Sequence, residues 1–381
     1  MAGLYVHIPF CKKKCRYCSF VSFEGMEHHE KEYVSAIKQE AKILREQGFL
    51  EKIQIDTIYI GGGTPSLLAA PTARDLVDSL MELFAIDRKG LVEASLECNP
   101  ESVNKPLLET LRDAGINRIS LGIQDLTSGG LEILGRIHSP EDAIKACKLV
   151  RDVGFEELCV DIIYGLPGQD TRWLSKTLVR LIGLEPTHIS AYELTLEDGT
   201  PLKQLVTKGE ISLPSQERSL ELTQFLEDFL NKQGFRQYEI SNFAVPGHEC
   251  VHNINYWMCG DYVGLGCGAV SFMGGTRYFN TKGLPEYMKR IQTGRLAFEE
   301  RETLDIEARF RESFIMGLRM TKGIDRNLFI TRFGIDPFKY YGKSLERMCS
   351  LGLMEAKEEH STIRLTKRGR YISNYVLSYF V

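Results

Sequence analysis

The clearest chemistry in this sequence belongs to three cysteines near its start. Cys11, Cys15 and Cys18 follow a C-x3-C-x2-C spacing, and thiolates this close together can hold one small metal centre. A structural zinc site uses four ligands, and no second C-x2-C pair accompanies these three. Three ligands on an iron–sulfur cluster would leave one iron open to a substrate or cofactor. Zinc with a remote fourth ligand such as His7 or Cys98 is one alternative, and three ordinary thiols are the other.

Glycines and polar side chains with binding chemistry follow several short apolar runs. The glycine-rich residues 61–64 let the backbone approach a ligand closely. Glu97 can accept hydrogen bonds from hydroxyl groups, and Gln124 can both donate and accept. Arg136 offers a fork of donors for a carboxylate. Because an aspartate inside an apolar run is costly unless it is paired, Asp161 is predicted to face a site.

These residues need a scaffold, and the chain alternates short apolar runs with longer amphipathic segments. Six runs have the length and composition of buried strands: 4–8, 57–60, 94–97, 118–123, 158–163 and 188–194. Helical patterns occupy 30–47, 72–85, 105–114, 140–153, 171–183 and 215–233. This alternation predicts an α/β fold with a parallel sheet, either doubly wound or an open barrel. In such folds the chemistry lies at the carboxyl ends of the strands, where the polar residues above are expected to meet.

The pattern changes after about residue 235. Residues 236–282 are rich in glycine, tyrosine, phenylalanine and asparagine and show no clear helical period. Helices are predicted at 305–318, 326–333 and 338–351, then a hairpin of 353–356 with 362–365, and a closing helix at 366–379. We therefore expect three parts: a core (1–235), an aromatic and glycine-rich extension (236–295), and a small helical, winged-helix-like domain (296–381). That last domain is equally well interpreted as a packing lid.

Composition limits the class of protein. The 381 residues include 47 basic and 51 acidic side chains, and a net charge of −4 gives no basic surface for nucleic acid. Ten cysteines with three bunched together favour a metal or cluster site in a reducing compartment over a disulfide framework. Neither a signal peptide nor a membrane span is recognisable, so a cytoplasmic location is expected.

The sequence from His7 to Cys11, with the three-cysteine spacing, resembles the signature of the radical S-adenosylmethionine (SAM) superfamily. Along nearly its whole length the chain resembles the oxygen-independent coproporphyrinogen III oxidases and their relatives, the HemW-type haem chaperones. The resemblance implies an open (β/α)6 partial TIM barrel with a [4Fe–4S] cluster on Cys11, Cys15 and Cys18 and SAM at the fourth iron. It assigns cofactor contacts to Tyr5, Tyr17, Gly62, Gly63, Thr64, Glu97, Gln124, Arg136, Asp161 and Thr195.

Two features favour the chaperone branch of this family. The decarboxylating oxidases carry a longer N-terminal segment and a cysteine two residues after the third cluster cysteine, where this chain has Phe20. Residues 252–257 match the H-N-x-x-Y-W motif that is tied to haem binding in the HemW-like proteins. Neutral imidazole is a normal haem ligand, so His252 is predicted to bind the iron, with His248 as its rival. A thiolate ligand from nearby Cys250, Cys259 or Cys267 has no attachment signature in its favour.

The function implied by the resemblance is that of a haem chaperone. The protein would bind haem, SAM and the cluster, and would transfer haem to acceptor proteins such as respiratory enzymes. The alternatives are oxidative decarboxylation of coproporphyrinogen III to protoporphyrinogen IX and a radical SAM methyltransferase that degrades haem. The sequence does not decide whether SAM is cleaved.

Overall fold

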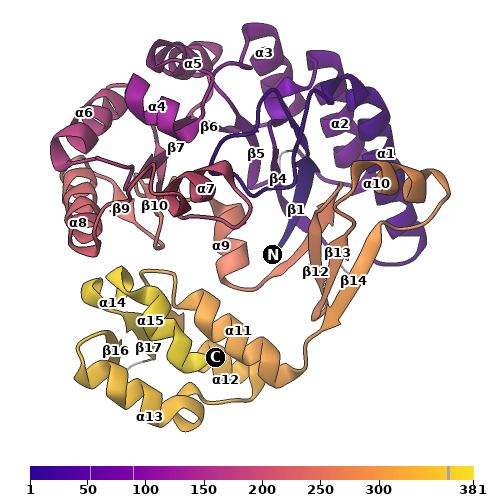
Figure 1. The fold of residues 1–381 in the computed structure, drawn as a ribbon. Coiled ribbons are helices and arrows are strands. Elements are labelled where there is room, and N and C mark those ends of the chain that lie inside the picture. The colour runs from indigo at the N-terminus through magenta and orange to yellow at the C-terminus, as the bar shows by residue number, and fades with distance from the viewer. Residues whose placement is uncertain (52, 89, 358–360) are drawn as a thin grey trace.

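The computed structural model describes residues 1–381 except 52, 89 and 358–360. Six parallel strands lie side by side in the order in which they occur in the chain (Figure 1). They are β1 (Ala2–Ile8), β4 (Ile55–Gly62), β5 (Glu93–Cys98), β6 (Arg118–Gln124), β7 (Glu157–Tyr164) and β8 (His188–Glu193). All six predicted strands are confirmed to within a few residues. Their order has two ends that do not pair with each other, so the barrel is open.

Helices cover the outside of the sheet (Figure 1). They are α1 (Glu30–Glu46), α2 (Ala70–Leu83), α3 (Lys105–Ala114), α4 (Ser128–Leu134), α5 (Pro140–Val153), α6 (Thr171–Ile182) and α8 (Gln216–Lys232). The short helix α7 (Pro201–Thr207) lies instead against the loop after β1, where the Leu202 amide donates to the Arg16 carbonyl (Figure 1).

The six predicted helices are confirmed to within a few residues, whereas α4 and α7 were not predicted. Local capping sets the ends of several of these helices. In α5, for example, the Ser139 side chain accepts from the Asp142 amide, Pro140 occupies the first turn, and Gly154 ends the helix in a left-handed conformation.

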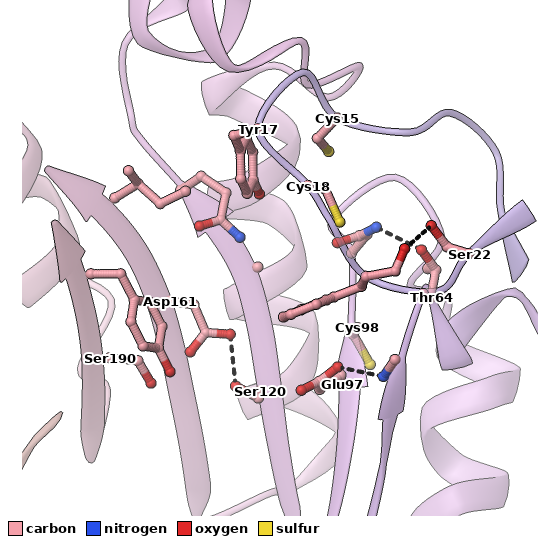
Figure 2. A pocket seen from close by; sticks show the side chains of 18 of the residues that line it. Cys15, Tyr17, Cys18, Ser22, Thr64, Glu97, Cys98, Ser120, Asp161 and Ser190 are labelled. Carbon is pink, nitrogen blue, oxygen red and sulfur yellow. Dashed lines mark hydrogen bonds between the residues drawn. The ribbon is translucent and has the colours of Figure 1, made fainter. Parts of the chain in front are cut away.

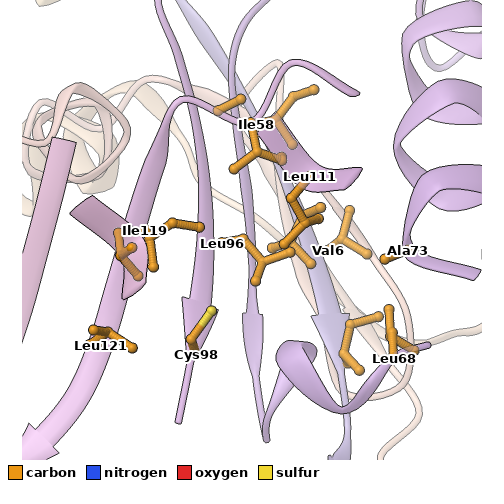
Figure 3. Packing of buried hydrophobic residues seen from close by; sticks show 14 of the residues in the cluster. Val6, Ile58, Leu68, Ala73, Leu96, Cys98, Leu111, Ile119 and Leu121 are labelled. Atoms are coloured by element: carbon orange, nitrogen blue, oxygen red, sulfur yellow. The ribbon is translucent and has the colours of Figure 1, made fainter. Parts of the chain in front are cut away.

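The main hydrophobic core lies between the strands and these helices. Leu96 and Ile119 on neighbouring strands pack toward Leu111 of α3 and Ala73 of α2 (Figure 3). Each fully buried aliphatic side chain of this kind contributes about 1.5–3 kcal/mol. The other face of the same strands carries Glu97, Ser120 and Asp161, which turn toward a cavity. The alternation of strand side chains thus separates the core from the site.

The extension that follows the barrel adds strands to both edges of the sheet. On one side β10 (Asn242–Ala244) pairs antiparallel with β8, and β9 (Arg236–Gln237) pairs with β10. On the other side β11 (Asp261–Leu265) lies parallel to β1. The sheet continues through antiparallel β12 (Val270–Met273), β13 (Thr276–Asn280) and β14 (Phe298–Thr303). Between them lie α9 (Val251–Trp257) and α10 (Leu284–Gln292). The barrel strands and the strands of the extension therefore form one continuous sheet of 12 strands, and the boundaries near 235 and 295 stay predictions.

The last segment has its own hydrophobic core, built around Phe310, Phe314 and Phe380. Its elements are α11 (Ile306–Gly317), β15 (Ile324–Asp325), α12 (Arg326–Phe333), α13 (Pro337–Ser350), β16 (Met354–Ala356), β17 (Thr362–Leu365), α14 (Lys367–Tyr371) and α15 (Ser373–Leu377). The three-stranded sheet β15-β17-β16 beside these helices confirms the winged-helix-like arrangement. The single closing helix predicted at 366–379 was wrong, because the backbone leaves the helical region at Ile372. Of the described helices, none is both long enough and apolar enough to cross a lipid bilayer.

Candidate cluster and SAM site

A cavity of about 400 Å³ lies at the carboxyl ends of the barrel strands (Figure 2). Twelve of the predicted site residues line it: Cys11, Cys15, Tyr17, Cys18, Gly62, Gly63, Thr64, Glu97, Gln124, Arg136, Asp161 and Thr195. Most come from the loop after β1 and from the ends of β4 through β8, and Arg136 comes from the turn after α4. The expected meeting of these side chains at one edge of the sheet is confirmed, whereas their binding roles stay predictions.

The cysteine loop is held in place by backbone contacts. Its first cysteine lies on the short strand β2 (Phe10–Cys11), which pairs with β3 (Phe23–Glu24) where the loop returns. In the middle of the loop, the Arg16 amide donates to the Leu134 carbonyl at the end of α4 (3.0 Å). Gly135 follows with φ of 72°, and a Cβ there would lie 2.8 Å from Cγ of Arg16. A glycine at this position therefore lets α4 end against the loop.

The three thiols are arranged more like cluster ligands than like ligands of one ion. Among the described residues no group of three His, Cys, Asp or Glu side chains is placed to hold a single metal ion. Each thiolate of an iron–sulfur cluster binds a different iron, so the sulfurs need only face a common space, and these three do. Burial raises the pKa of the Cys11 and Cys18 thiols. The donor set and its placement thus fit a cluster.

Two of these cysteines are joined by a chain of hydrogen bonds that the sequence did not reveal. Arg136 donates to Cys15 Sγ (3.3 Å) and to Asn99 Oδ1 (2.7 Å). Asn99 Nδ2 donates to Thr64 Oγ1 (2.9 Å), and Thr64 donates to Cys11 Sγ (3.6 Å). Asn99 directly follows β5, so the same strand-end argument that selected Glu97 could have selected it.

The glycine turn after β4 is shaped by close contacts on both sides. Gly62 has φ of 114°, and a Cβ on it would lie 2.7 Å from the His7 ring. A Cβ on Gly63 would lie 2.7 Å from the Phe10 carbonyl oxygen and 3.0 Å from Cys11 Sγ. The Gly62 amide donates to Glu97 Oε2 (3.1 Å), and the Tyr59 hydroxyl donates to Glu97 Oε1 (2.8 Å). Burial, with a smaller contribution from Asp161, raises the pKa of Glu97 to about 7.

Two further polar side chains, Gln124 and Asp161, face the cavity. Gln124 has φ of 66°, a strained value for this residue type, and it lies at an irregularity in the pairing of β6 with β7. Asp161 accepts a hydrogen bond from Ser120 Oγ at 3.0 Å (Figure 2), and burial raises its pKa. The prediction that Asp161 is paired and faces the cavity is confirmed.

Deeper in the cavity the sequence interpretation missed a polar pair. From the sequence alone, Cys159 within an apolar run is interpreted as a small buried hydrophobe. Its Sγ instead lies 2.9 Å from Nδ1 of His188, and both side chains line the cavity. Cys159, Asp161 and Ile163 alternate along β7 and all three face the cavity. Two-residue periodicity from Asp161 could therefore have identified Cys159.

The structure places two predicted residues outside this cavity. Tyr5 lines a second cavity of about 590 Å³ that lies beside the first. His252 lines neither cavity and is 1% exposed. Its Nδ1 lies 2.8 Å from Thr57 Oγ1 and its Nε2 lies 3.0 Å from the Tyr256 hydroxyl. Burial lowers its pKa to about 3. Ligation of haem iron by His252 stays a prediction, and it would require one of these bonds to break.

The rest of the haem motif divides between two surroundings. Tyr256 reaches the second cavity. Trp257 packs against the last domain, with the Arg319 guanidinium 4.5 Å from its ring centroid. The rival His248 lies at the opposite end of the barrel from the cysteine loop, where its Nδ1 is 2.6 Å from Glu157 Oε1 at the start of β7. The motif thus links the barrel, the second cavity and the C-terminal domain.

Comparison with known proteins agrees with this architecture. Residues 5–181 match the radical SAM superfamily, and residues 304–372 match the HemN C-terminal domain. The solved structure of coproporphyrinogen III oxidase (HemN) from Escherichia coli superposes with a TM-score of 0.84 at 25% identity. That superposition covers 100% of this chain and 89% of the oxidase.

Curated relatives match over most or all of the chain. The heme chaperone HemW of Bacillus subtilis (strain 168) is 32% identical over 381 residues, which cover 100% of this chain and 99% of that protein. The heme chaperone HemW of Escherichia coli (strain K12) is 34% identical over 338 residues, which cover 87% of this chain and 86% of that protein. The chain therefore belongs to the radical SAM superfamily and, within it, to the family that contains the HemW heme chaperones.

Proposed function

We propose that this protein is a haem chaperone that binds haem, a [4Fe–4S] cluster and SAM, and transfers haem to acceptor proteins. The observation that carries the proposal is that three cysteines, a glycine turn and polar strand ends meet in one cavity. Its relatives that match over nearly their whole length are named heme chaperones. We extend haem binding and haem transfer to this chain from the names of those relatives.

Cys11, Cys15 and Cys18 would hold the cluster. Donors already reach two of these sulfurs, from Thr64 to Cys11 and from Arg136 to Cys15. Hydrogen bonds to sulfur and a nearby cation favour the thiolate form that a metal requires. Such a cluster supplies, when bound, a one-electron donor and an open iron next to SAM.

The polar strand ends would position SAM. Gly62 and Gly63 present bare backbone to the cavity, so a ligand can approach closely. Glu97 is held by two donors and can accept from ribose hydroxyls or an amino group. Arg136 supplies a fixed cation for a carboxylate, and Gln124 and Asp161 extend the polar wall. Tyr17, Thr64 and Thr195 line the same space.

A second candidate function is coproporphyrinogen III oxidation, which the close structural match to HemN favours. Phe20 argues against it. Its side chain is 63% exposed and borders both cavities, at the position where the oxidases carry a cysteine. A phenyl ring there cannot supply the acid–base or nucleophilic chemistry of a thiol.

One anaerobic assay distinguishes these functions. Cluster-reconstituted protein receives SAM and a reductant with either haem or coproporphyrinogen III, and is then mixed with the apo form of a b-type cytochrome. We expect haem to bind with its ring intact and to appear on the cytochrome, while coproporphyrinogen stays unchanged. Multiple-turnover formation of protoporphyrinogen IX would overturn the chaperone proposal. Loss of the haem spectrum with release of iron would instead identify a haem-degrading enzyme.

A further inference from the structure

The second cavity continues the inner face of the sheet beyond the first. Ser19, Phe20, Gly62 and Glu97 border both cavities, so a ligand in the second would lie beside the cluster loop and the glycine turn. The cavity opens over β1, β11 and β12 and is closed on one side by α11 of the C-terminal domain. Its volume of about 590 Å³ is in the range of small-molecule and cofactor sites.

Its wall is built from aromatic rings that already contact one another. Tyr256 meets Tyr262 edge-on, with ring centroids 4.7 Å apart, and Tyr262 lies 6.3 Å from Phe272. Arg277 lies over Phe272 at 5.5 Å, but it is bonded to both Glu302 and Glu312. Because these carboxylates offset its charge, Arg277 would contribute little to holding the two propionates of a haem, which would lie at the open side of the cavity. The wall itself suits the large, flat ring of such a ligand.

Two sulfur side chains face this cavity from different elements. Cys259 lies in the turn after α9, and Met316 lies on α11. Cys259 has a backbone φ of 48°. The Arg332 guanidinium of the C-terminal domain donates to the Cys259 carbonyl oxygen at 2.6 Å. That contact fixes a strained backbone in the orientation that directs Cys259 toward the cavity. Thiolate and thioether sulfur are both established axial ligands of haem iron.

The histidines near the cavity are less suited to this role. His7 borders the cavity, but its Nδ1 lies 3.0 Å from the Tyr5 hydroxyl and its Nε2 lies 2.7 Å from the Val21 carbonyl oxygen. His252 lies outside the cavity, and both of its ring nitrogens have partners as well. The Cys259 thiol also has a hydrogen-bonding neighbour, the Ser313 side chain, but unlike His252 it faces the cavity.

We propose that the second cavity holds the haem against its aromatic wall and that Cys259, rather than His252, is the ligand to the iron. The proposal rests on the haem-binding function proposed above and adds the place and the ligand. The haem edge would then lie next to Phe20 and Glu97, at the border with the SAM cavity. The C-terminal domain contributes to the site through Met316 and through the hold of Arg332 on the Cys259 turn.

The test uses the full chain with its cluster reconstituted and titrates it with ferric haem. Cys259→Ser is expected to weaken haem binding at least tenfold and to remove the absorption and electron paramagnetic resonance signature of a thiolate ligand. Val270→Trp, on β12, fills the cavity and is expected to weaken binding similarly while the cluster iron content stays unchanged. Cys349→Ser in the C-terminal domain is the matched control, and His252→Ala should keep the wild-type haem spectrum.

The outcomes separate this inference from the proposed function. If the wild type takes up no haem, the chaperone function fails, and the inference fails with it. If the wild type binds haem but Cys259→Ser keeps the same affinity and spectrum, only the inference fails. Circular dichroism and cluster content establish that each variant folds. If Val270→Trp does not fold, Cys259→Ser, which replaces one atom, decides alone.

Discussion

The two cavities lie side by side on one sheet but are built differently. The first is polar and is formed where consecutive strands β4 through β8 end, together with the loop after β1. The second is mainly aromatic and joins β1 to β11, β12, the end of α9 and α11. The first therefore depends mainly on the repeated strand–helix alternation, and Cys250 and Asn253 of the extension complete its lining. The second exists only once β11 has paired with β1 and the C-terminal domain has docked.

On the functions proposed above, this difference would give the two cavities different ligands. The first carries thiols, carboxylates and a guanidinium linked by hydrogen bonds, as a charged cofactor requires. The second carries aromatic rings and sulfur beside Glu97 and Glu312, with Arg277 already paired, and its wall suits the ring of a large, flat ligand. The common border at Phe20 and Glu97 would allow a ligand in one to affect the other.

The largest expected effect separates the two cavities. Cys15→Ser should abolish assembly of the cluster, because a hydroxyl is a poor iron ligand and the site has no spare thiol in its loop. Iron and sulfide content after reconstitution measures this, with Cys349→Ser as the control. If the cavities bind independently, haem affinity in Cys15→Ser should stay within about twofold of the wild type, less than the 1.4 kcal/mol of a tenfold change. A parallel loss of haem binding would show that they act as one site.

The next largest effect concerns how the extension that forms the second cavity is attached to the barrel. Glu40 of α1 accepts hydrogen bonds from the Gly266 amide (2.8 Å), Asn280 Nδ2 (2.7 Å) and the Tyr287 hydroxyl (2.8 Å). It thereby ties the turn after β11, the end of β13 and α10 to the barrel. Burial raises its pKa from 4.5 to about 7 against these hydrogen bonds. The folded state therefore binds more protons than the unfolded state between these two values.

Stability should fall as the pH rises through that interval, by about 3 kcal/mol from this one group. Glu40→Gln removes the titration, so the difference in unfolding free energy between wild type and variant should change between pH 4.5 and pH 7.5. Urea unfolding at several pH values measures it. Glu97 titrates in the same range but is present in both proteins, so its contribution cancels. A difference that does not vary with pH would show that Glu40 is not protonated in the folded protein.

The sequence predicted the barrel and its first cavity much better than the extension and the second cavity. Buried parallel strands appear as short apolar runs, and side chains such as Glu97 and Asp161 stand out against them. The pairing of β11 with β1 joins residues about 260 positions apart, and no local pattern encodes such a contact. The contact of Trp257 with Arg319 depends on how the last domain docks. The haem motif could be recognised in the sequence. The burial of His252 between Thr57 and Tyr256 could not be predicted from it.

The smallest predicted effect tests how tightly the first region is built. In Gly63→Ala the added methyl group would lie 2.7 Å from the Phe10 carbonyl oxygen, and backbone cannot move aside as a side chain can. We expect a loss of about 1–3 kcal/mol in stability, typical of overpacking, and a lower cluster content because Cys11 must shift.

Gly129→Ala in α4 is the matched control, since its Cβ would meet no atom within 4 Å and alanine favours a helix. Haem affinity should be unchanged in both variants, because Gly63 lines the first cavity and not the second. If Gly63→Ala instead weakens haem binding and leaves the cluster intact, the glycine turn serves the aromatic cavity, and the division between the two regions does not hold.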